Sequence, residues 1–423
     1  MNESVDPVKP TILMMTDSPL RHTGHAVVVR EVATGLSKLN KYNLVVAGWG
    51  HKGEAHPFPF TVIPASAKDF GKTGTPGEGV DGIEKIIDKV KPDFFWTIGD
   101  TWMFDYVPDL KNRSSFKWIA YTPVDGEPIP KAWGPWLKNP ERLVMETEYG
   151  YNTVKNYDAS IDHRWIYHGC NSGKYYPLPL EAKLAVKKDI QYLKITGENN
   201  LTYAKGLPEN DFVVGTLARN QMRKNYDRNF KAFSIFAKNK PHAKLWIHAA
   251  PVDLGYNLVQ LAYFFGIQNK VIFSTKASTR DGLSEEEMNL VVNMWDVHFL
   301  PTQGEGFGIP ILETMAAGVP QLVPDYTSHV EFAKKGGMLI PLDPNDDYVM
   351  GLPHPILRAF PKPSVCASLL ETLHGDTALR VKLALGARET AKKMTWEVTI
   401  PQWDAIFQEF LNPRASAAPK KFK

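Results

Sequence analysis

The sequence predicts an α/β protein made of two doubly wound domains in tandem, each built on a parallel sheet. Short apolar runs alternate with segments of helical periodicity along most of the chain, which is typical of βαβ units. The alternation is interrupted between about residues 171 and 208, where a turn-rich and then polar stretch separates two series. The length of 423 residues is too great for one compact core and suits two domains of roughly 200 residues each.

The first series opens with the apolar run Thr11–Met15, which we interpret as a buried strand. Apolar residues then recur at three- and four-residue spacing from Val28 to Leu39 and predict a helix. A second strand is expected over Asn43–Ala47, so the three elements form a βαβ unit, which requires parallel strands. The same series is expected to hold a helix at 83–90 and strands at 93–98, 117–121, 143–146 and 165–167.

The second series repeats the pattern. Strands are expected at 211–217, 243–249, 270–274, 297–301 and 319–323, and helices at 229–237, 254–265, 284–293, 310–317 and 378–393. Ser284 with Glu287 three residues on matches a capping box at the start of one helix. A last helix is expected at 396–411. We therefore expect a first domain over residues 1–178, a second over 179–395 and a flexible basic tail over 412–423.

Composition excludes several protein classes. Basic and acidic residues number 49 and 46, a net charge of +3, so a strongly basic nucleic-acid binder is not favoured. Two cysteines cannot form a disulfide framework and indicate a reduced, intracellular protein. The N-terminal residues lack a signal-peptide pattern, and no run of roughly 18 apolar residues occurs. We expect a cytoplasmic protein and leave open a peripheral contact with the inner membrane face.

The most informative stretch is Pro301–Glu331, in which Gly304, Gly306 and Gly308 follow a predicted strand and precede a predicted helix. Glycines there allow a phosphate to approach the backbone, and the helix start offers unpaired N–H groups. Ile309 stands where a dinucleotide fingerprint requires its third glycine. A P-loop is also absent, because its nearest match, SAKDFGKT, begins with Ser66 instead of glycine.

Two carboxylates and two cations give this stretch a chemical interpretation. Glu305 and Glu313 flank the glycine turn, and carboxylates accept paired hydrogen bonds from the hydroxyls of a sugar or a ribose. Arg219 and Lys224 follow another strand, where they could stabilise a diphosphate leaving group without a metal ion. The alternatives are a plain glycine turn with a solvated helix, and an exposed basic loop.

The same residues carry a resemblance to a known family. EGFGIPILETMAAGVPQLVPD resembles the Glu-x7-Glu signature of retaining GT-B glycosyltransferases of family 4. LARNQMRKN resembles the Arg-Leu-x3-Lys segment of that family and places Arg219 and Lys224 at its Arg and Lys. IYHGCNSGKYYP resembles its interdomain segment, although Asn171 replaces the usual Asp. Trp396–Leu411 resembles the C-terminal helix that crosses back onto the first domain.

The resemblance implies a GT-B enzyme whose two Rossmann-like domains face a central cleft. It implies that the first domain binds the acceptor and that the second binds a nucleotide-diphosphate sugar, whose sugar is transferred with retention of configuration and without a metal. By this resemblance Arg219 and Lys224 hold the diphosphate, Glu305 the donor sugar and Glu313 the ribose. The other implied donor-site residues are Gly306, Phe307, Gly308 and Ile309, together with Gly24 in the loop after the first strand.

Candidates in the first domain rest on weaker signals. Asp125 follows a strand at a position where family members often carry His or Asp near the reacting sugar, and the alternative is a turn carboxylate. We include it among the catalytic candidates with Arg219, Lys224 and Glu305. Asp100 and Trp102 are candidates for the acceptor site. Weaker candidates are His22, His25 and Asp17 for polar contacts, and Trp133 and Trp136 for stacking on a sugar.

The donor and acceptor stay open at this point. A UDP-, GDP- or ADP-sugar fits the motifs, as does a glycan, lipid or small-molecule acceptor, and a nucleic-acid acceptor is not favoured. The histidines show no metal-ligand spacing, so we expect no cofactor and no catalytic metal. Three rival functions remain: a glycosyltransferase for modified bases in DNA, a sugar-nucleotide epimerase of the same fold, and a nucleotide-sugar-binding module without turnover.

Overall fold

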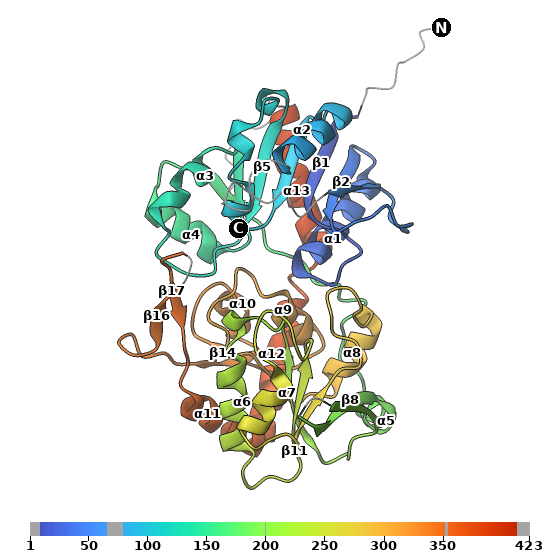
Figure 1. Cartoon of the computed structure of the whole chain (residues 1–423), viewed down its shortest axis with the longest axis vertical. Helices are drawn as coiled ribbons and strands as arrows, with labels where there is room; N and C mark the ends of the chain where they lie inside the picture. Colours follow the sequence, from blue (N-terminus) through green and yellow to red (C-terminus); the bar gives the residue numbers. More distant parts are fainter. Residues whose placement is uncertain (1–8, 66–78, 199, 352–353, 413–423) are drawn as a thin grey trace. The chain divides into compact units, whose positions relative to one another are not determined.

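The computed structural model describes residues 9–65, 79–198, 200–351 and 354–412 (Figure 1). Ser66 and, apart from Asn412, the predicted tail lie outside these residues. By its contacts the chain divides into two compact units. The first contains the chain up to Pro123, residues 130–169 and the chain from Trp396 onward; the second contains Val124–Ile129 and Cys170–Thr395. Residues 170–178, which we had assigned to the first domain, thus make their contacts in the second unit.

The first unit is built on a fully parallel seven-stranded sheet with the order β3-β2-β1-β4-β5-β6-β7. Its strands are β1 (Thr11–Asp17), β2 (Asn43–Trp49), β3 (Thr61–Ala65), β4 (Phe94–Ile98), β5 (Lys117–Thr122), β6 (Arg142–Met145) and β7 (His163–Trp165). Its helices include α1 (Gly24–Leu39), α2 (Gly79–Val90), α3 (Gly134–Lys138) and α4 (Glu148–Tyr157). Because the strand order reverses at β1, ligands are expected beyond the carboxyl ends of β1 and β4.

The last helix, α13 (Trp396–Leu411), packs on this first unit (Figure 1). Trp403 is fully buried, with its ring centroid 4.8 Å from that of Trp96 and 4.7 Å from that of Tyr121. An ideal Cβ on Gly35 of α1 would lie 2.5 Å from the side chain of Ile400, so the glycine lets the two helices approach closely. The prediction that the final helix returns to the first domain is confirmed.

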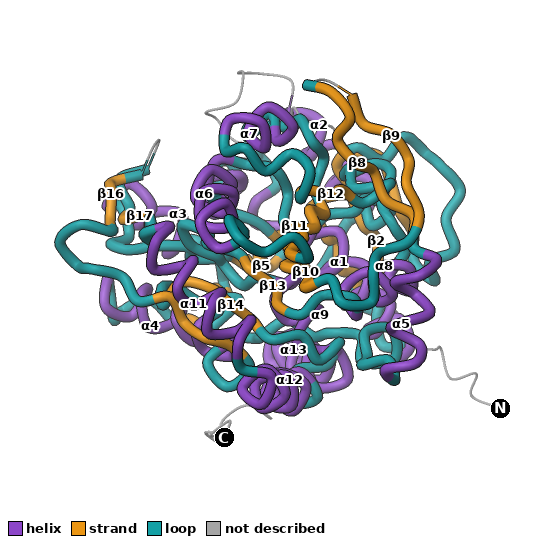
Figure 2. Tube along the Cα trace, turned by 90° about the horizontal axis from the view of Figure 1, so that it is seen from below, coloured by secondary structure: helices purple, strands orange, loops and turns teal. Residues whose placement is uncertain are grey.

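The second unit contains an eight-stranded sheet with the order β15-β14-β13-β10-β11-β12-β8-β9. Its parallel strands are β10 (Phe212–Leu217), β11 (Ala243–His248), β12 (Val271–Phe273), β13 (Val297–Phe299), β14 (Gln321–Pro324) and β15 (Gly337–Ile340). Helices α6 (Tyr226–Phe236) and α7 (Leu258–Phe264) lie on one side of β10, β11 and β13, and α9 (Ile309–Ala316) and α12 (Thr377–Ala391) lie on the other (Figure 2). The two Rossmann-like sheets confirm the predicted α/β class.

One region differs from the prediction. Residues 171–208, read as a linker, contain α5 (Leu180–Asp189) and the hairpin of β8 (Gln191–Gly197) and β9 (Asn200–Lys205). The hairpin extends the sheet through antiparallel pairing of β8 with β12. Most of its side chains are exposed or half-buried, so the segment lacks the apolar run or clean alternation by which a strand is recognised. Other elements without a prediction include β3, α3, α4 and β15, as well as α10 (Val330–Ala333), the hairpin β16 (Tyr348–Met350) and β17 (Leu357–Ala359), and α11 (Pro363–Gly375).

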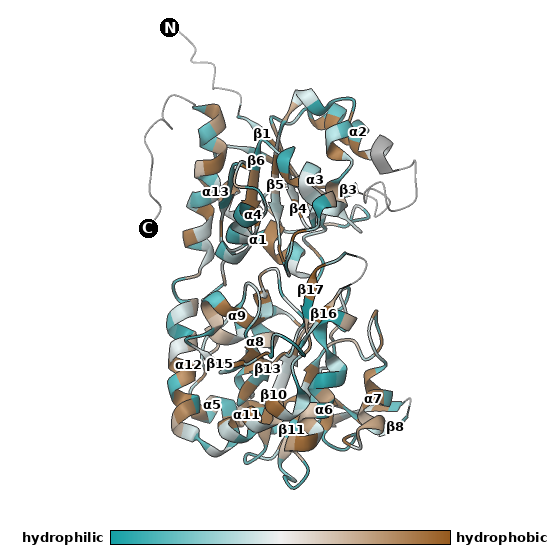
Figure 3. Cartoon of the chain, turned by 90° about the vertical axis from the view of Figure 1, so that its left-hand side faces the viewer, coloured by the Kyte–Doolittle hydropathy of each residue, from teal (hydrophilic) through white to brown (hydrophobic). Residues whose placement is uncertain are grey.

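The core of the second unit lies between the sheet and its helices. Val214, Leu245, Phe273, Phe299 and Leu322, from neighbouring strands, are fully buried and belong to one hydrophobic cluster. Colouring by hydropathy shows both hydrophobic and hydrophilic residues along the covering helices, as amphipathic helices require (Figure 3). Helix α8 (Glu285–Asn293) has the predicted capping box between Ser284 and Glu287.

Within the described ranges no helix combines the length and apolar character needed to cross a bilayer.

Gly215 provides a test of this packing. It lies in the middle of β10, where an ideal Cβ would stand 1.9 Å from the ring of Trp295, itself 4% exposed. Gly215→Ala should therefore lower the free energy of unfolding by about 2 kcal/mol or more through overpacking. Gly375→Ala is the matched control, because no atom lies within 4 Å of its added Cβ. Urea unfolding monitored by tryptophan fluorescence would measure the free energy of unfolding of both variants. Equal stability of the two variants would contradict the predicted overpacking at Gly215.

Candidate functional site

The basic loop and the glycine turn meet at the carboxyl edge of the second sheet. The loop follows β10 and the turn follows β13, and these strands are parallel neighbours. The amide of Gln303 donates a 2.8 Å hydrogen bond to the carbonyl of Arg223, and the Thr302 hydroxyl donates a 3.2 Å hydrogen bond to the same oxygen. The two motifs that were separate in the sequence therefore form one site.

Two buried asparagines hold the basic loop in place. The Asn220 side chain donates to the carbonyl of Tyr256 at 2.7 Å and to that of Ala250 at 3.2 Å. Asn225 has a left-handed backbone, with φ of 52°, and its side chain donates to the carbonyl of Pro301 at 2.8 Å. Sequence reasoning did not identify these residues. Only the tolerance of asparagine for left-handed turns could have suggested Asn225.

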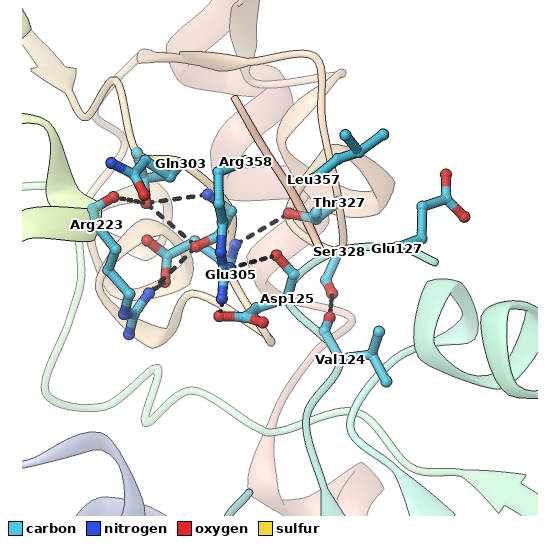
Figure 4. Close-up of polar contacts among 12 residues, drawn as sticks. Val124, Asp125, Glu127, Arg223, Gln303, Glu305, Thr327, Ser328, Leu357 and Arg358 are labelled. Atoms are coloured by element: carbon cyan, nitrogen blue, oxygen red, sulfur yellow. Dashed lines mark hydrogen bonds and ion pairs between the residues drawn. The ribbon is translucent and has the colours of Figure 1, made fainter. Parts of the chain in front are cut away.

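A buried ion pair forms the centre of the site. Lys224 Nζ lies 2.6 Å from Oε1 and 2.8 Å from Oε2 of Glu305, and the two side chains are 9% and 5% exposed. Arg223 reaches Oε2 of the same carboxylate at 3.3 Å and the Gly304 carbonyl at 3.2 Å. The Glu305 amide donates to the Thr327 hydroxyl at 3.0 Å. Figure 4 shows Arg223 and Glu305 facing each other within this network.

The electrostatics keep both partners charged near neutral pH. Burial alone would raise the pKa of Glu305, but Lys224 and Arg223 outweigh it and hold that pKa well below its usual range. Burial and the neighbouring Arg223 lower the pKa of Lys224 to about 8, against the opposing effect of Glu305. Two cations thus share one carboxylate, and the surplus positive charge suits an anionic ligand.

The glycine turn leads into α9 as predicted. Gly308 precedes the helix with φ of 97°, a left-handed conformation that favours glycine. Phe307 is buried and stacks on Phe332 with ring centroids 5.1 Å apart, so its side chain anchors the turn. Ile309 begins the helix; Pro310 has no N–H, and the amides of Ile311 and Leu312 donate to the Gly308 carbonyl at 2.9 Å and 3.3 Å. Glu313, one turn further on, is half-buried.

Arg219, which the resemblance assigns to the diphosphate together with Lys224, pairs with a different carboxylate from the one that Lys224 contacts. Its side chain is 40% exposed and makes a 2.8 Å ion pair with Asp253 in the loop after β11. Arg223, which the sequence interpretation left aside, takes the position next to Glu305. Arg223 lies in a short 3-10 helix, Met222–Lys224, which the sequence analysis did not predict.

Asp125 also belongs to the second unit. Its carboxylate lies 2.8 Å from a guanidinium nitrogen of Arg358, and the two side chains are 23% and 16% exposed. The carbonyl of Asp125 lies against Gly304, immediately before Glu305. The structure therefore brings together Asp125, Lys224 and Glu305 from the candidate list, and adds Arg223 and Arg358.

The remaining candidates lie in the first unit. Asp17 ends β1 and accepts hydrogen bonds from Arg21 at 3.0 Å and from Thr23 at 2.6 Å. Gly24 is the first residue of α1, which is capped by Thr23.

Asp100 directly precedes a short 3-10 helix, Thr101–Phe104, which contains the half-buried Trp102. Both follow β4 and so lie at the carboxyl edge of the first sheet, where ligands bind in such folds. Trp133 is only 7% exposed, so core packing explains it better than stacking on a sugar does. In the part of the chain that is described, no group of three or more His, Cys, Asp or Glu residues is arranged to hold a metal ion.

Comparisons with known proteins found a matching family and several relatives. Residues 199–348 match the family described as Glycosyl transferases group 1. A D-inositol 3-phosphate glycosyltransferase of Salinispora arenicola is 28% identical over 203 residues, which are 46% of this chain and 40% of the relative. The chain thus spans less than half the length of that relative.

Solved structures share the fold over nearly the whole chain. Sucrose-phosphate synthase of Thermosynechococcus elongatus superposes with a TM-score of 0.71 at 14% identity, covering 96% of this chain and 100% of that one. The protein HepE of Anabaena, solved with UDP and glucose, has a TM-score of 0.66 at 13% identity, covering 95% and 100%. The GT-B fold expected from the sequence is confirmed.

The buried ion pair leads to a stability prediction. Glu305→Ala leaves Lys224 and Arg223 without their shared carboxylate, so the free energy of unfolding should fall by about 3–5 kcal/mol. Replacing both partners with apolar residues, Lys224→Met with Glu305→Leu, should recover much of the loss. Glu389→Ala on α12 is the control, because its pair with Lys393 is exposed and should contribute less than about 1 kcal/mol. Chemical denaturation of each variant would measure these changes in the free energy of unfolding. If Glu305→Ala destabilises the protein no more than Glu389→Ala does, the predicted contribution of the buried pair is wrong.

His298 leads to a prediction of pH dependence. It is fully buried on β13, where the Leu217 amide donates to Nε2 at 3.3 Å and Nδ1 lies 2.7 Å from Gln321 Oε1. Burial lowers the pKa of His298 to about 4. The unfolded chain then binds a proton below about pH 6.5 that the native state excludes, so stability falls as the pH drops toward 4.

Between pH 6.5 and pH 5 this single group should remove about 2 kcal/mol of stability. Urea unfolding of the wild type and of His298→Gln at both pH values measures the difference. The Gln variant should lose correspondingly less on acidification, and identical pH dependence of the two proteins would refute the assignment.

Proposed function

We propose that this chain transfers a sugar from a nucleotide-diphosphate sugar to an acceptor hydroxyl, and the match of residues 199–348 to the family described as Glycosyl transferases group 1 supports this proposal. The proposal includes retention of the anomeric configuration and no requirement for a metal ion. The observation that carries it is the buried pair of Lys224 and Glu305 at the carboxyl edge of the second sheet, with the partly exposed Arg223 beside it.

The cations of the cluster are proposed to bind the diphosphate of the donor. An ammonium group has three N–H donors, and Glu305 takes two of those of Lys224, so one can bind a phosphate oxygen. Arg223 adds a second cation at the same point, and Arg219 a third further along the loop. Departure of the nucleotide diphosphate builds negative charge on its terminal phosphate, and prearranged cations stabilise this charge without a metal.

The carboxylates are proposed to bind the transferred sugar and the ribose of the nucleotide. An ionised carboxylate offers about four lone-pair sites, so Glu305 can accept hydrogen bonds from sugar hydroxyls while it holds Lys224. Glu313, on the first turns of α9, is assigned to the ribose diol. Backbone amides at Gly306, Phe307 and Gly308 are assigned to the sugar or the phosphates, as the start of a helix favours anions.

The transfer is written as a front-face displacement. The bond between the anomeric carbon and the phosphate oxygen breaks, and the acceptor oxygen forms its bond to that carbon from the same face. The acceptor proton passes to the departing phosphate oxygen, so no protein base is required. In this scheme the cluster contributes charge stabilisation and positioning.

The names of similar proteins suggest which donors and acceptors to test first. HepE was solved with UDP and glucose, which supports testing a UDP-sugar first, followed by GDP- and ADP-sugars. The curated relative is named for transfer to an inositol phosphate, which supports polyhydroxylated acceptors, free or as part of a glycan or lipid. Acceptor binding is assigned to the first unit, with Asp100 and Trp102 as contacts.

A thermal-shift panel of nucleotide diphosphates and their sugars, with EDTA throughout, tests the function. One nucleotide should raise the melting temperature by several degrees, since ligand at about 100 times Kd stabilises by about 2.7 kcal/mol. Glu313→Gln should weaken its binding about ten-fold or more through loss of charged hydrogen bonds to the ribose. Glu286→Gln on α8, with a 66% exposed side chain, is the control.

Product analysis after incubation of the protein with the stabilising sugar nucleotide and candidate acceptors separates the rival functions. Release of nucleotide diphosphate with transfer to an acceptor supports a transferase, whereas binding without turnover supports a binding module. Interconversion of the sugar nucleotide would indicate an epimerase. If no nucleotide shifts the melting temperature, the proposed donor class is wrong. If a shift appears only after a divalent metal ion replaces EDTA, the proposed metal independence is wrong.

A further inference from the structure

A short segment that follows β5 is held by the second unit. This segment, Val124–Ile129, is called here the 124–129 loop. Its Glu127 carbonyl accepts a 2.8 Å hydrogen bond from the amide of Leu357, and its Val124 carbonyl accepts one of 3.3 Å from the Ser328 hydroxyl. Figure 4 shows the contact between Ser328 and Val124. The loop is therefore attached at Val124 and at Glu127 to other segments of the second unit.

The loop is packed so closely that two glycines are required. An ideal Cβ on Gly304 would stand 2.2 Å from the carbonyl oxygen of Asp125, and Gly304 has φ of 156°. An ideal Cβ on Gly126 would stand 2.8 Å from the carbonyl oxygen of Leu357. Each glycine allows one backbone to approach the other. The backbone of Asp125 is therefore fixed directly against the turn that carries Glu305.

Arg358 fixes the side chain of Asp125 as well. One guanidinium nitrogen lies 2.8 Å from the Asp125 carboxylate and donates a 3.0 Å hydrogen bond to the Asp125 carbonyl. Both contacts are made to a single residue, so they restrict its side-chain rotation. The pair is largely withdrawn from water, and such a pair is less screened than an exposed one.

Arg358 is itself carried on a framework bonded to the cluster. It lies in β17, where the amide of Ala359 donates to the Gln303 carbonyl at 3.0 Å. The carbonyl of Ala359 accepts a 3.2 Å hydrogen bond from Asn225, next to Lys224. The strand that presents Arg358 is thus attached both to the basic loop and to the glycine turn.

The cluster cations are competing partners for Asp125. Burial lowers the pKa of Lys224, and Asp125 is among the carboxylates whose charge acts on it in the opposite direction. Arg223 shares Glu305 with Lys224. A released Asp125 carboxylate would therefore be attracted to Lys224 and Arg223. There it would pair with the cations and compete with a diphosphate for them.

We propose that Arg358 is a positioning residue that holds Asp125 at the sugar end of the cluster and keeps Lys224 and Arg223 available to the diphosphate. The inference rests on the proposed function. In its held position the Asp125 anion stabilises the positive charge that builds on the sugar ring while the phosphate departs. Arg358 itself touches neither substrate in this account.

Double-mutant analysis of nucleotide-diphosphate binding tests the proposal. By calorimetry, Arg358→Ala should raise the Kd of the nucleotide diphosphate selected by the thermal-shift panel about ten-fold. Adding Asp125→Ala should bring the Kd back to within about two-fold of the wild type, because the competing carboxylate is gone. Arg358→Lys should give an intermediate Kd, since it keeps the charge. Such non-additivity is the measure of coupling between neighbouring residues.

A matched arginine separates positioning from simple folding support. Arg228 donates a 3.3 Å hydrogen bond to the Pro361 carbonyl and lies 5.0 Å from the Phe360 ring, just beyond β17, and has no contact with Asp125 among those described. Arg228→Ala should leave the Kd unchanged. In turnover, Arg358→Ala should lower kcat about ten-fold or more, and the double variant should retain the kcat of Asp125→Ala.

The outcomes distinguish this inference from the proposed function. An unchanged Kd in Arg358→Ala, or a loss of affinity that Asp125→Ala does not reverse, overturns the inference alone. An equal loss in Arg228→Ala overturns it as well, because disturbance of the hairpin would then explain the result. Failure of the wild-type protein to bind any nucleotide diphosphate overturns the proposed function and, with it, this inference.

Discussion

The buried pair of Lys224 and Glu305 is the interaction on which the rest of the site depends. Two charges removed from water cost several kcal/mol each unless they meet with good geometry. Here the ammonium contacts both carboxylate oxygens within 2.8 Å. That geometry requires two loops from different strands to be held together, and the hydrogen bonds from Gln303 and Asn225 do so.

The pair also explains how the anion site that we propose could exist before its ligand arrives. Free cations at the edge of a sheet would repel each other and would be exposed to other anions. Glu305 supplies a partner for Lys224 and Arg223, and their common charge still favours an anion. A ligand that brings both phosphate and hydroxyl groups can engage the cations and the carboxylate together, so the arrangement favours a sugar phosphate over a simple phosphate.

Sequence reasoning found the elements that obey local rules. The stretch Pro301–Glu331 was legible because a strand, a glycine turn and a helix follow one another, and it placed Glu305 correctly at the sheet edge. The hairpin at 191–205 was missed because most of its side chains are exposed or half-buried, which hides its periodicity. Arg223 and Arg358 were missed because their partners are distant in the sequence, and only the tertiary fold shows which of several arginines meets a given carboxylate.

The membership of the 124–129 loop in the second unit has a practical consequence for dissecting the protein. A gene fragment that encodes only residues 170–395 would omit this segment, although the closeness of Gly304 to the backbone of Asp125 shows that the unit is shaped around it. Such a fragment would leave the amide of Leu357 and the guanidinium of Arg358 without their partners. A fragment cut at residues 170 and 395 would thus lack part of the second unit. To express that unit alone, a permuted gene that fuses the 124–129 loop to residue 170 would be the better choice.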